Sequence, residues 1–115
     1  MNIIENNLNL PKEAIFNLSI MNNDELVGNI TIYEHPDDKT GGQVHLEIVP
    51  KWRCRWLSRS LRDTIVLNLI NFSKKNQLSI LYSTAFAKVS PRLLDFFGFL
   101  EYYKRKPKTY YYLMI

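Results

Sequence analysis

The chain has 115 residues and a formal net charge of +4; 46% of its residues are hydrophobic and 23% are charged. This length and composition predict one globular domain over residues 1–115 and exclude long disordered tracts. The single cysteine, Cys54, excludes an internal disulfide. No apolar run approaches the ~20 residues of a membrane span, and the first ten residues lack a signal-peptide pattern. We therefore expect a cytoplasmic protein without a membrane partner.

The first part of the chain predicts antiparallel strands. Residues 14–21 and 25–34 alternate apolar and polar side chains, which is typical of half-buried strands. The Asn-Asn-Asp triplet at 22–24 is a turn signal, so the two strands are expected to pair as a hairpin. Residues 1–13 form an N-terminal segment, with an extended conformation as one option, and residues 35–42 form a loop rich in Asp and Gly.

The middle of the chain predicts a strand, a long helix and another strand. Residues 43–49 alternate, with His45, Glu47 and Val49 on one face, and a proline follows that cannot continue a strand. Residues 57–75 carry the clearest helical pattern, because apolar side chains recur every three or four residues. Residues 78–83 then form a short apolar strand. Two strands joined through a helix in this way are expected to run parallel.

The last part predicts a short helix and two strands. Ser90 is expected to cap a helix over 92–97, which Gly98 ends. Residues 99–104 and 109–114 read as strands separated by a proline. Together the elements predict a single-domain α/β fold with a central mixed twisted sheet of about five to six strands. A long helix follows the central strand, and a short helix precedes the last two strands.

Basic residues cluster where the central strand leads into the long helix. Arg53, Arg55 and Arg59 lie there, and backbone N–H groups and the helix dipole add partial positive charge. A second basic cluster lies at residues 104–108. Such clusters attract the phosphates of nucleic acids, nucleotides or CoA, and an ordinary solvated surface is the alternative.

Two segments resemble motifs of the GNAT acyltransferase family. That family carries a hydrophobic-x-Pro-x-aromatic-Arg segment on its fourth strand, and Ile48, Pro50, Trp52 and Arg53 match it here. The segment leads into an Arg/Gln-x-x-Gly-x-Gly/Ala loop that binds the CoA pyrophosphate. Residues 93–99 are similar to the family's helix that ends in Leu-Gly-Phe before two antiparallel strands. The order of elements agrees from about residue 14 to the C-terminus.

This resemblance implies an N-acyltransferase that transfers an acetyl group from acetyl-CoA to an amine acceptor, without a metal. His45 and Glu47 lie where family members often place a base, and an ordinary strand histidine with a rim carboxylate is the alternative. The residues implied to bind acetyl-CoA are Ile48, Val49, Arg53, Cys54, Arg55, Trp56, Leu57, Ser58 and Arg59.

Several positions depart from the family pattern. Trp56 and Ser58 replace the two glycines of the loop, and Cys54 replaces a further frequent glycine. The general-acid tyrosine of the family falls on Leu94 and its usual asparagine on Ala87. The remaining candidates for a catalytic hydroxyl are Tyr82, Ser83, Tyr110, Tyr111 and Tyr112.

Three functions stay open on the sequence. The first is the active N-acyltransferase. The second is a GNAT-shaped protein without catalysis that serves as a binding or structural component. Compact chains of this kind are carried by bacteriophages, which implies the host cytoplasm or the virion as a location. The third is a nucleic-acid-binding module that uses the basic clusters with Trp52, Trp56 and the tyrosines.

Three further points concern single features. Cys54 is an alternative acyl-accepting nucleophile, because neighbouring arginines favour a thiolate. His35 beside Asp37 and Asp38 is a poor match to metal-ligand spacing, and we do not predict a metal there. The short N-terminal half omits helices that usually flank the substrate cleft, a gap that a second copy or another protein partner would fill.

Overall fold

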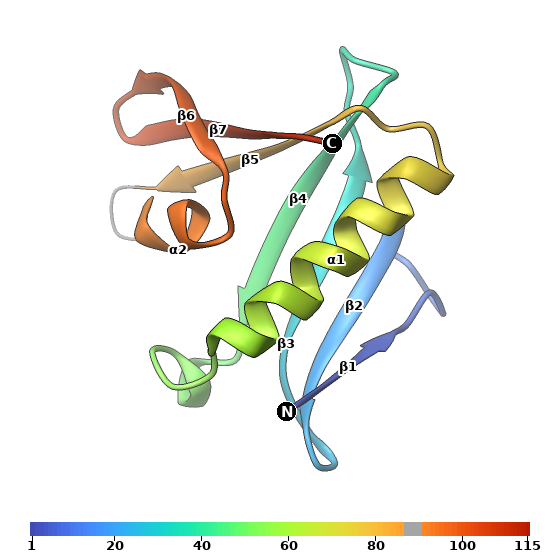
Figure 1. Cartoon of the computed structure of the whole chain (residues 1–115), viewed down its shortest axis with the longest axis vertical. Coiled ribbons are helices and arrows are strands. Elements are labelled where there is room, and N and C mark those ends of the chain that lie inside the picture. The colour runs from blue at the N-terminus through green and yellow to red at the C-terminus, as the bar shows by residue number, and fades with distance from the viewer. Residues whose placement is uncertain (87–90) are drawn as a thin grey trace.

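The computed structural model describes residues 1–86 and 91–115 and contains one seven-stranded mixed sheet with two α-helices (Figure 1). The strands lie in the order β1-β2-β3-β4-β5-β7-β6. Their bounds are β1 Asn2–Glu5, β2 Ala14–Asn22, β3 Glu25–Glu34, β4 Gly41–Ile48, β5 Ile80–Phe86, β6 Leu100–Arg105 and β7 Lys108–Met114. The helices are α1 Arg59–Lys75 and α2 Pro91–Phe96, and a 3₁₀ turn covers Pro50–Trp52.

The predicted hairpin of β2 and β3 is confirmed, and a further strand pairs on each side of it. β2 and β3 pair antiparallel up to Asn22 and Glu25, so Asn23 and Asp24 form the turn. Asn23 has a φ of 55°, a conformation that asparagine tolerates better than most residues. β3 pairs antiparallel with β4, and Gly28 lies opposite Ile48, where a Cβ atom would collide with the carbonyl oxygen of Glu47.

The strand β1 agrees with the extended option for the N-terminal segment and adds one strand to the predicted sheet. It pairs antiparallel with β2 and brings the sheet to seven strands, against the predicted five to six. Its four residues are mostly exposed, so they lack the alternation by which a strand is found in a sequence. Residues 6–13 connect β1 to β2 without a helix.

The helix α1 buries the predicted apolar stripe against one face of the sheet. Leu61, Ile65 and Leu69 are buried, and the ring of Phe72 stacks on Phe16 of β2 with centroids 4.2 Å apart. The helix begins at Arg59 rather than at residue 57, because the Ser58 hydroxyl accepts a hydrogen bond from the Leu61 amide and so acts as the N-cap.

The parallel strands β4 and β5 separate along their length. They pair only at Gly41↔Ile80, Gly42↔Leu81 and Gln43↔Tyr82. Figure 1 shows them side by side near the C-terminus and then diverging, β4 in green and β5 in orange. β5 starts two residues later than predicted, because the apolar Leu78 belongs to the connection after α1 and its amide donates to the Ser73 carbonyl.

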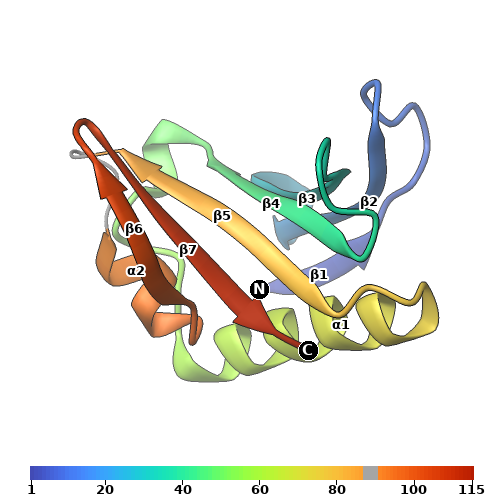
Figure 2. The same ribbon diagram turned by 90° about the horizontal axis from the view of Figure 1, so that it is seen from above.

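Both helices lie on the same side of the sheet, as the view in Figure 2 shows. We call this side the inner face; it carries the core, with Leu18, Ile32 and Leu81 fully buried. Gly98 ends α2 with a φ of 90°, as predicted for a C-terminal cap, and the helix itself starts and stops one residue earlier than expected. The predicted cap Ser90 lies outside the described residues. Within the part of the chain that the structure describes, no helix is long and apolar enough to cross a membrane.

Candidate functional site

A cleft opens where β4 and β5 diverge. Its volume is about 530 Å³. Its walls combine aliphatic, aromatic and hydroxyl side chains: Tyr33, Gln43, Val44, His45, Leu46, Tyr82, Ser83, Thr84, Ala85, Leu93 and Leu94. Sequence reasoning missed Tyr33, Gln43 and Thr84, since their place in the cleft depends on where the strands part.

The edge of β4 that faces the cleft keeps unused backbone groups. The Val44 carbonyl points toward β5, because it accepts a hydrogen bond from the Ser83 hydroxyl at 3.0 Å. Backbone polar groups alternate along a strand, so the N–H and C=O groups of Leu46 and Ile48 point to the same side. On the other edge β3 pairs with β4 at these positions, but on the cleft side, within the described residues, β5 does not. An extended ligand with amide groups fits this edge, because it can pair with them as a strand would.

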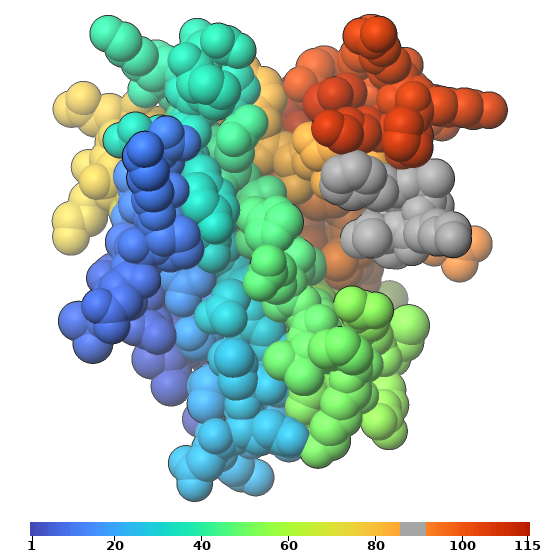
Figure 3. Space-filling model, turned by 180° about the vertical axis from the view of Figure 1, so that it is seen from behind, coloured from blue at the N-terminus to red at the C-terminus, as the bar shows by residue number. Residues whose placement is uncertain are grey.

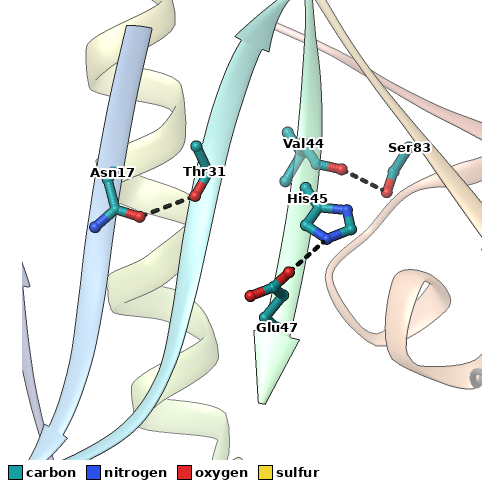
Figure 4. A network of polar contacts seen from close by, with 6 residues as sticks. All are labelled: Asn17, Thr31, Val44, His45, Glu47 and Ser83. Carbon is teal, nitrogen blue, oxygen red and sulfur yellow. Dashed lines mark hydrogen bonds and ion pairs between the residues drawn. The ribbon is translucent and has the colours of Figure 1, made fainter. Parts of the chain in front are cut away.

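His45 and Glu47 lie together on the outer face of β4, the face away from α1. The Nε2 atom of His45 is 3.3 Å from Oε1 of Glu47, as Figure 4 shows. The side chains are 58% and 73% exposed, so both meet solvent. His45 lines the cleft, while Glu47 lies two residues further along β4, toward its C-terminal end. Val49, predicted on the same face, falls just beyond the strand.

Next to this pair, four polar side chains of β2 and β3 form hydrogen bonds across the outer face. The Thr31 hydroxyl donates to Asn17 Oδ1 at 2.9 Å, and the Ser19 hydroxyl donates to Asn29 Oδ1 at 3.0 Å (Figure 4 shows the first of these bonds). Ser19 and Thr31 are buried, so these bonds satisfy groups that water does not reach. We call Asn17, Ser19, Asn29 and Thr31 the polar ladder.

The loop after β4 presents backbone N–H groups at the start of α1. The amides of Arg53, Arg55 and Leu61 are bonded within the loop and cap. Within the described residues, five consecutive amides that follow Arg55 have no acceptor: Trp56, Leu57, Ser58, Arg59 and Ser60. Unpaired amides of this kind at a helix N-terminus form a place where an anion is stabilised by hydrogen bonds and by the helix dipole.

Three arginines lie just before or among these residues in the sequence. Arg53, Arg55 and Arg59 are exposed, and the Arg55 guanidinium donates to the Lys51 carbonyl at 3.0 Å. Lys51 itself pairs with Glu25 at 2.6 Å, so part of this basic cluster is neutralised locally.

Trp56 and Cys54 occupy positions where the family has glycine. The Trp56 ring turns into the core, where it is 8% exposed and lies 6.4 Å from the Phe97 ring, so it does not cover the unpaired amides. Cys54 has a φ of 65°, the left-handed region that glycine adopts without strain. At Cys54 the loop backbone therefore adopts a conformation in which glycine is the usual residue, although the side chain here is larger.

The other candidate residues separate into those near the cleft and those away from it. Leu94 lines the cleft, and Ala87 lies outside the described residues. Tyr110 and Tyr112 do not line the cleft, and Tyr111 is buried on the inner face. His35 uses Nδ1 to accept the amides of Asp37 and Asp38, so it stabilises the turn before β4.

Tyr82 and Asp38 lie at the end of the cleft where the strands still pair. The Tyr82 hydroxyl donates to Asp38 Oδ2 at 3.0 Å, and the Thr40 hydroxyl and amide donate to Oδ1. The bonds from Thr40, and then that from Tyr82, lower the pKa of the Asp38 carboxyl. The bond to Asp38 in turn raises the pKa of Tyr82. This network ties the loop before β4 to β5.

Several solved acetyltransferase structures have a fold similar to that of this chain. A ribosomal-protein-alanine N-acetyltransferase from Brucella melitensis superposes with a TM-score of 0.66 at 12% identity, covering 87% of this chain and 68% of that one. A Bacillus subtilis acetyltransferase in complex with CoA gives 0.64 at 13% identity, with coverage of 90% and 78%. A GNAT domain from S. lividans gives 0.66 at 4% identity, with coverage of 87% and 60%. No protein-family model and no curated protein matches the sequence. The chain thus has the fold of the GNAT acetyltransferases.

Proposed function

We propose that the protein is an acyl-CoA-dependent N-acyltransferase that moves an acetyl group from acetyl-CoA to an amine. The observation that carries the proposal is the row of unpaired amides from Trp56 to Ser60, where the loop after β4 leads into α1. A pyrophosphate needs several donors close together and partial positive charge, and the start of α1 supplies both. The shared fold adds support, but a fold hosts many activities.

Acetyl-CoA fits the described residues in two parts. Its pyrophosphate would bind the amides of residues 56–60, with Arg53, Arg55 and Arg59 adding charge-assisted hydrogen bonds. Its amide-containing arm would run along the open edge of β4 and pair with Leu46 and Ile48. The Trp56 ring does not oppose this arrangement, because it packs in the core.

The reaction requires a base that removes a proton from the amine, and a leaving group that takes the electron pair of the broken C–S bond. The lone pair of a neutral amine attacks the thioester carbonyl, a C–N bond forms, and the C–S bond breaks to release a thiolate. Glu47 and His45 lie on the outer face beside the cleft, where they would take the proton that the amine loses, directly or through water. Their distance of 3.3 Å allows one group to pass a proton to the other.

The leaving thiolate has fewer candidates for an acid. Leu94 carries no proton to give, the Ser83 hydroxyl is engaged with the Val44 carbonyl, and the Tyr82 hydroxyl is engaged with Asp38. Tyr33 and Thr84 in the cleft wall are the remaining residues with hydroxyls. A second function, a GNAT-shaped protein that binds without catalysis, is favoured by the engagement of Ser83 and Tyr82. In the active enzyme, solvent reaching the open cleft would protonate the thiolate.

A transfer assay distinguishes the two functions. Acetyl-CoA and a panel of primary amines and amine-bearing peptides are incubated with the protein, and release of free thiol is followed. The N-acyltransferase predicts amine-dependent release that Glu47→Gln lowers at least about tenfold, with an altered pH profile. Glu34→Gln, an exposed carboxylate at the far end of β3, is the control that keeps its rate. Binding of acetyl-CoA without transfer to any amine supports the non-catalytic function.

A further inference from the structure

A cluster of tyrosines covers the outer face of β5, β7 and β6 and adjoins the cleft, which its member Tyr82 also lines. Tyr82 and Tyr112 pair across β5 and β7, and Tyr110 lies two residues along on the same face. Tyr102 connects them, since its ring centroid lies 6.3, 5.8 and 6.3 Å from those of Tyr82, Tyr112 and Tyr110. Tyr103 lies 5.6 Å from Tyr110. We call Tyr82, Tyr102, Tyr103, Tyr110 and Tyr112 the tyrosine platform.

A β-bulge places two consecutive tyrosines in this cluster. Neighbouring residues of a regular strand point to opposite faces. In β6, however, the register shifts between Glu101 and Tyr103, so Tyr102 is an extra residue without a partner in β7. Both Tyr102 and Tyr103 therefore reach the Tyr110 ring. Bulges re-aim side chains in this way at functional edges of sheets.

The two rings of the bulge contribute little to the core. Tyr102 and Tyr103 are each 52% exposed, and all six residues of β6 are exposed. An aromatic ring that stays half in water leaves a flat apolar surface free for a partner.

Positive charge lies directly beside the rings. Lys104 and Arg105 end β6, Lys106 lies in the turn, and Lys108 begins β7; we call these four residues the basic turn. Glu101 is the one carboxylate in either strand. Its Oε1 atom lies 3.7 Å from Nζ of Lys104. Arg105 pairs with Lys108 and follows Tyr103 by two residues, so its side chain leaves the same face of the strand. In Figure 3 this hairpin, in red, stands at the edge of the molecule, open to solvent.

We propose that the tyrosine platform and the basic turn bind single-stranded nucleic acid. Bases stack on the rings of Tyr102 and Tyr103, while Arg105 and Lys106 contact the phosphates. A duplex fits less well, because its bases are already stacked on one another and their flat faces are hidden. Trp56 takes no part, since its ring is in the core. The surface is separate from the residues proposed to hold acetyl-CoA.

Fluorescence anisotropy of a labelled oligothymidylate of about 12 nucleotides tests the proposal. We expect binding that weakens as salt rises, because phosphate contacts release counterions. Tyr102→Ala combined with Tyr103→Ala lowers the affinity about tenfold or more, while the double Phe variant retains it. Arg105→Gln with Lys106→Gln reduces the salt dependence. Lys74→Gln with Lys75→Gln, at the C-terminal end of α1, removes equal charge and changes the affinity less than about twofold.

Three results overturn the proposal. The first is no binding at low salt; the second is unchanged affinity in the double Ala variant, which indicates contact with any polyanion. The third is tighter binding to a duplex of the same length or to vesicles containing phosphatidylserine. Thermal unfolding of each variant establishes that a lost affinity does not come from a lost fold.

Discussion

The outer face of the sheet has two halves that differ in how their side chains use hydrogen bonds and exposure. On β2 and β3 the polar ladder is internally bonded, and two of its members are buried. On β6 the rings of Tyr102 and Tyr103 stay half exposed, although both lie against the Tyr110 ring of β7. The first half stabilises the fold, whereas the second leaves surface for a partner. The cleft lies between them, where β4 and β5 part.

The largest expected effect concerns two tyrosines on adjacent strands. Tyr111 is 3% exposed on the inner face, so Tyr111→Ala should lower the free energy of unfolding by about 3–5 kcal/mol. Tyr103→Ala, at an exposed ring, should change it by less than about 0.5 kcal/mol. Urea denaturation measures both. An equal loss in the two variants would mean that the exposed rings are structural and that the comparison between the two halves is wrong.

A smaller loss is expected in the polar ladder. Asn29→Ala removes the acceptor of the buried Ser19 hydroxyl and should lower the free energy of unfolding by about 1–3 kcal/mol. Asn71→Ala, on the exposed surface of α1, is the control with little effect. If denaturation finds no difference between these variants, water replaces the lost bonds and the ladder is not a stabilising element.

The smallest effect is a change in pH dependence at the paired end of the cleft. The folded pKa of Asp38 lies below 3.8, so its contribution to stability is present above pH 3.8 and is lost as the pH falls through the folded pKa. The folded pKa of Tyr82 lies above 10.0, so its contribution is present below pH 10.0 and is lost as the pH rises through the folded pKa. Tyr82→Phe should weaken the first dependence and abolish the second. Tyr110→Phe is the control, and stability profiles that match in both variants would contradict a role for the bond.

Much of the fold follows from periodicity in the sequence. The stripe of α1 and the alternation of β2 and β3 are strong because each element has apolar side chains on one face and polar ones on the other. β1 escapes prediction, since its mostly exposed residues obey no such pattern. The bulge at Tyr102 escapes it as well, because a register shift depends on pairing between strands and leaves no trace in either strand alone.

The candidate site is predictable in its position and not in its details. The basic residues between Pro50 and Arg59 point to an anion, and the structure has unpaired amides there. Whether Trp56 blocks them depends on the ring's direction, which its packing near Phe97 decides. The cleft itself requires knowing that β4 and β5 pair over only three residues, a property of the whole sheet.

The most direct measurement is a calorimetric titration with acetyl-CoA of the protein and of an Arg53→Ala, Arg55→Ala double variant. Lys74→Ala with Lys75→Ala serves as the control for loss of charge. We expect micromolar binding that the arginine variant weakens at least roughly tenfold and that the lysine variant leaves nearly unchanged. No binding at millimolar acetyl-CoA, or equal binding by the arginine variant, would contradict the assignment of the loop after β4 as a pyrophosphate site.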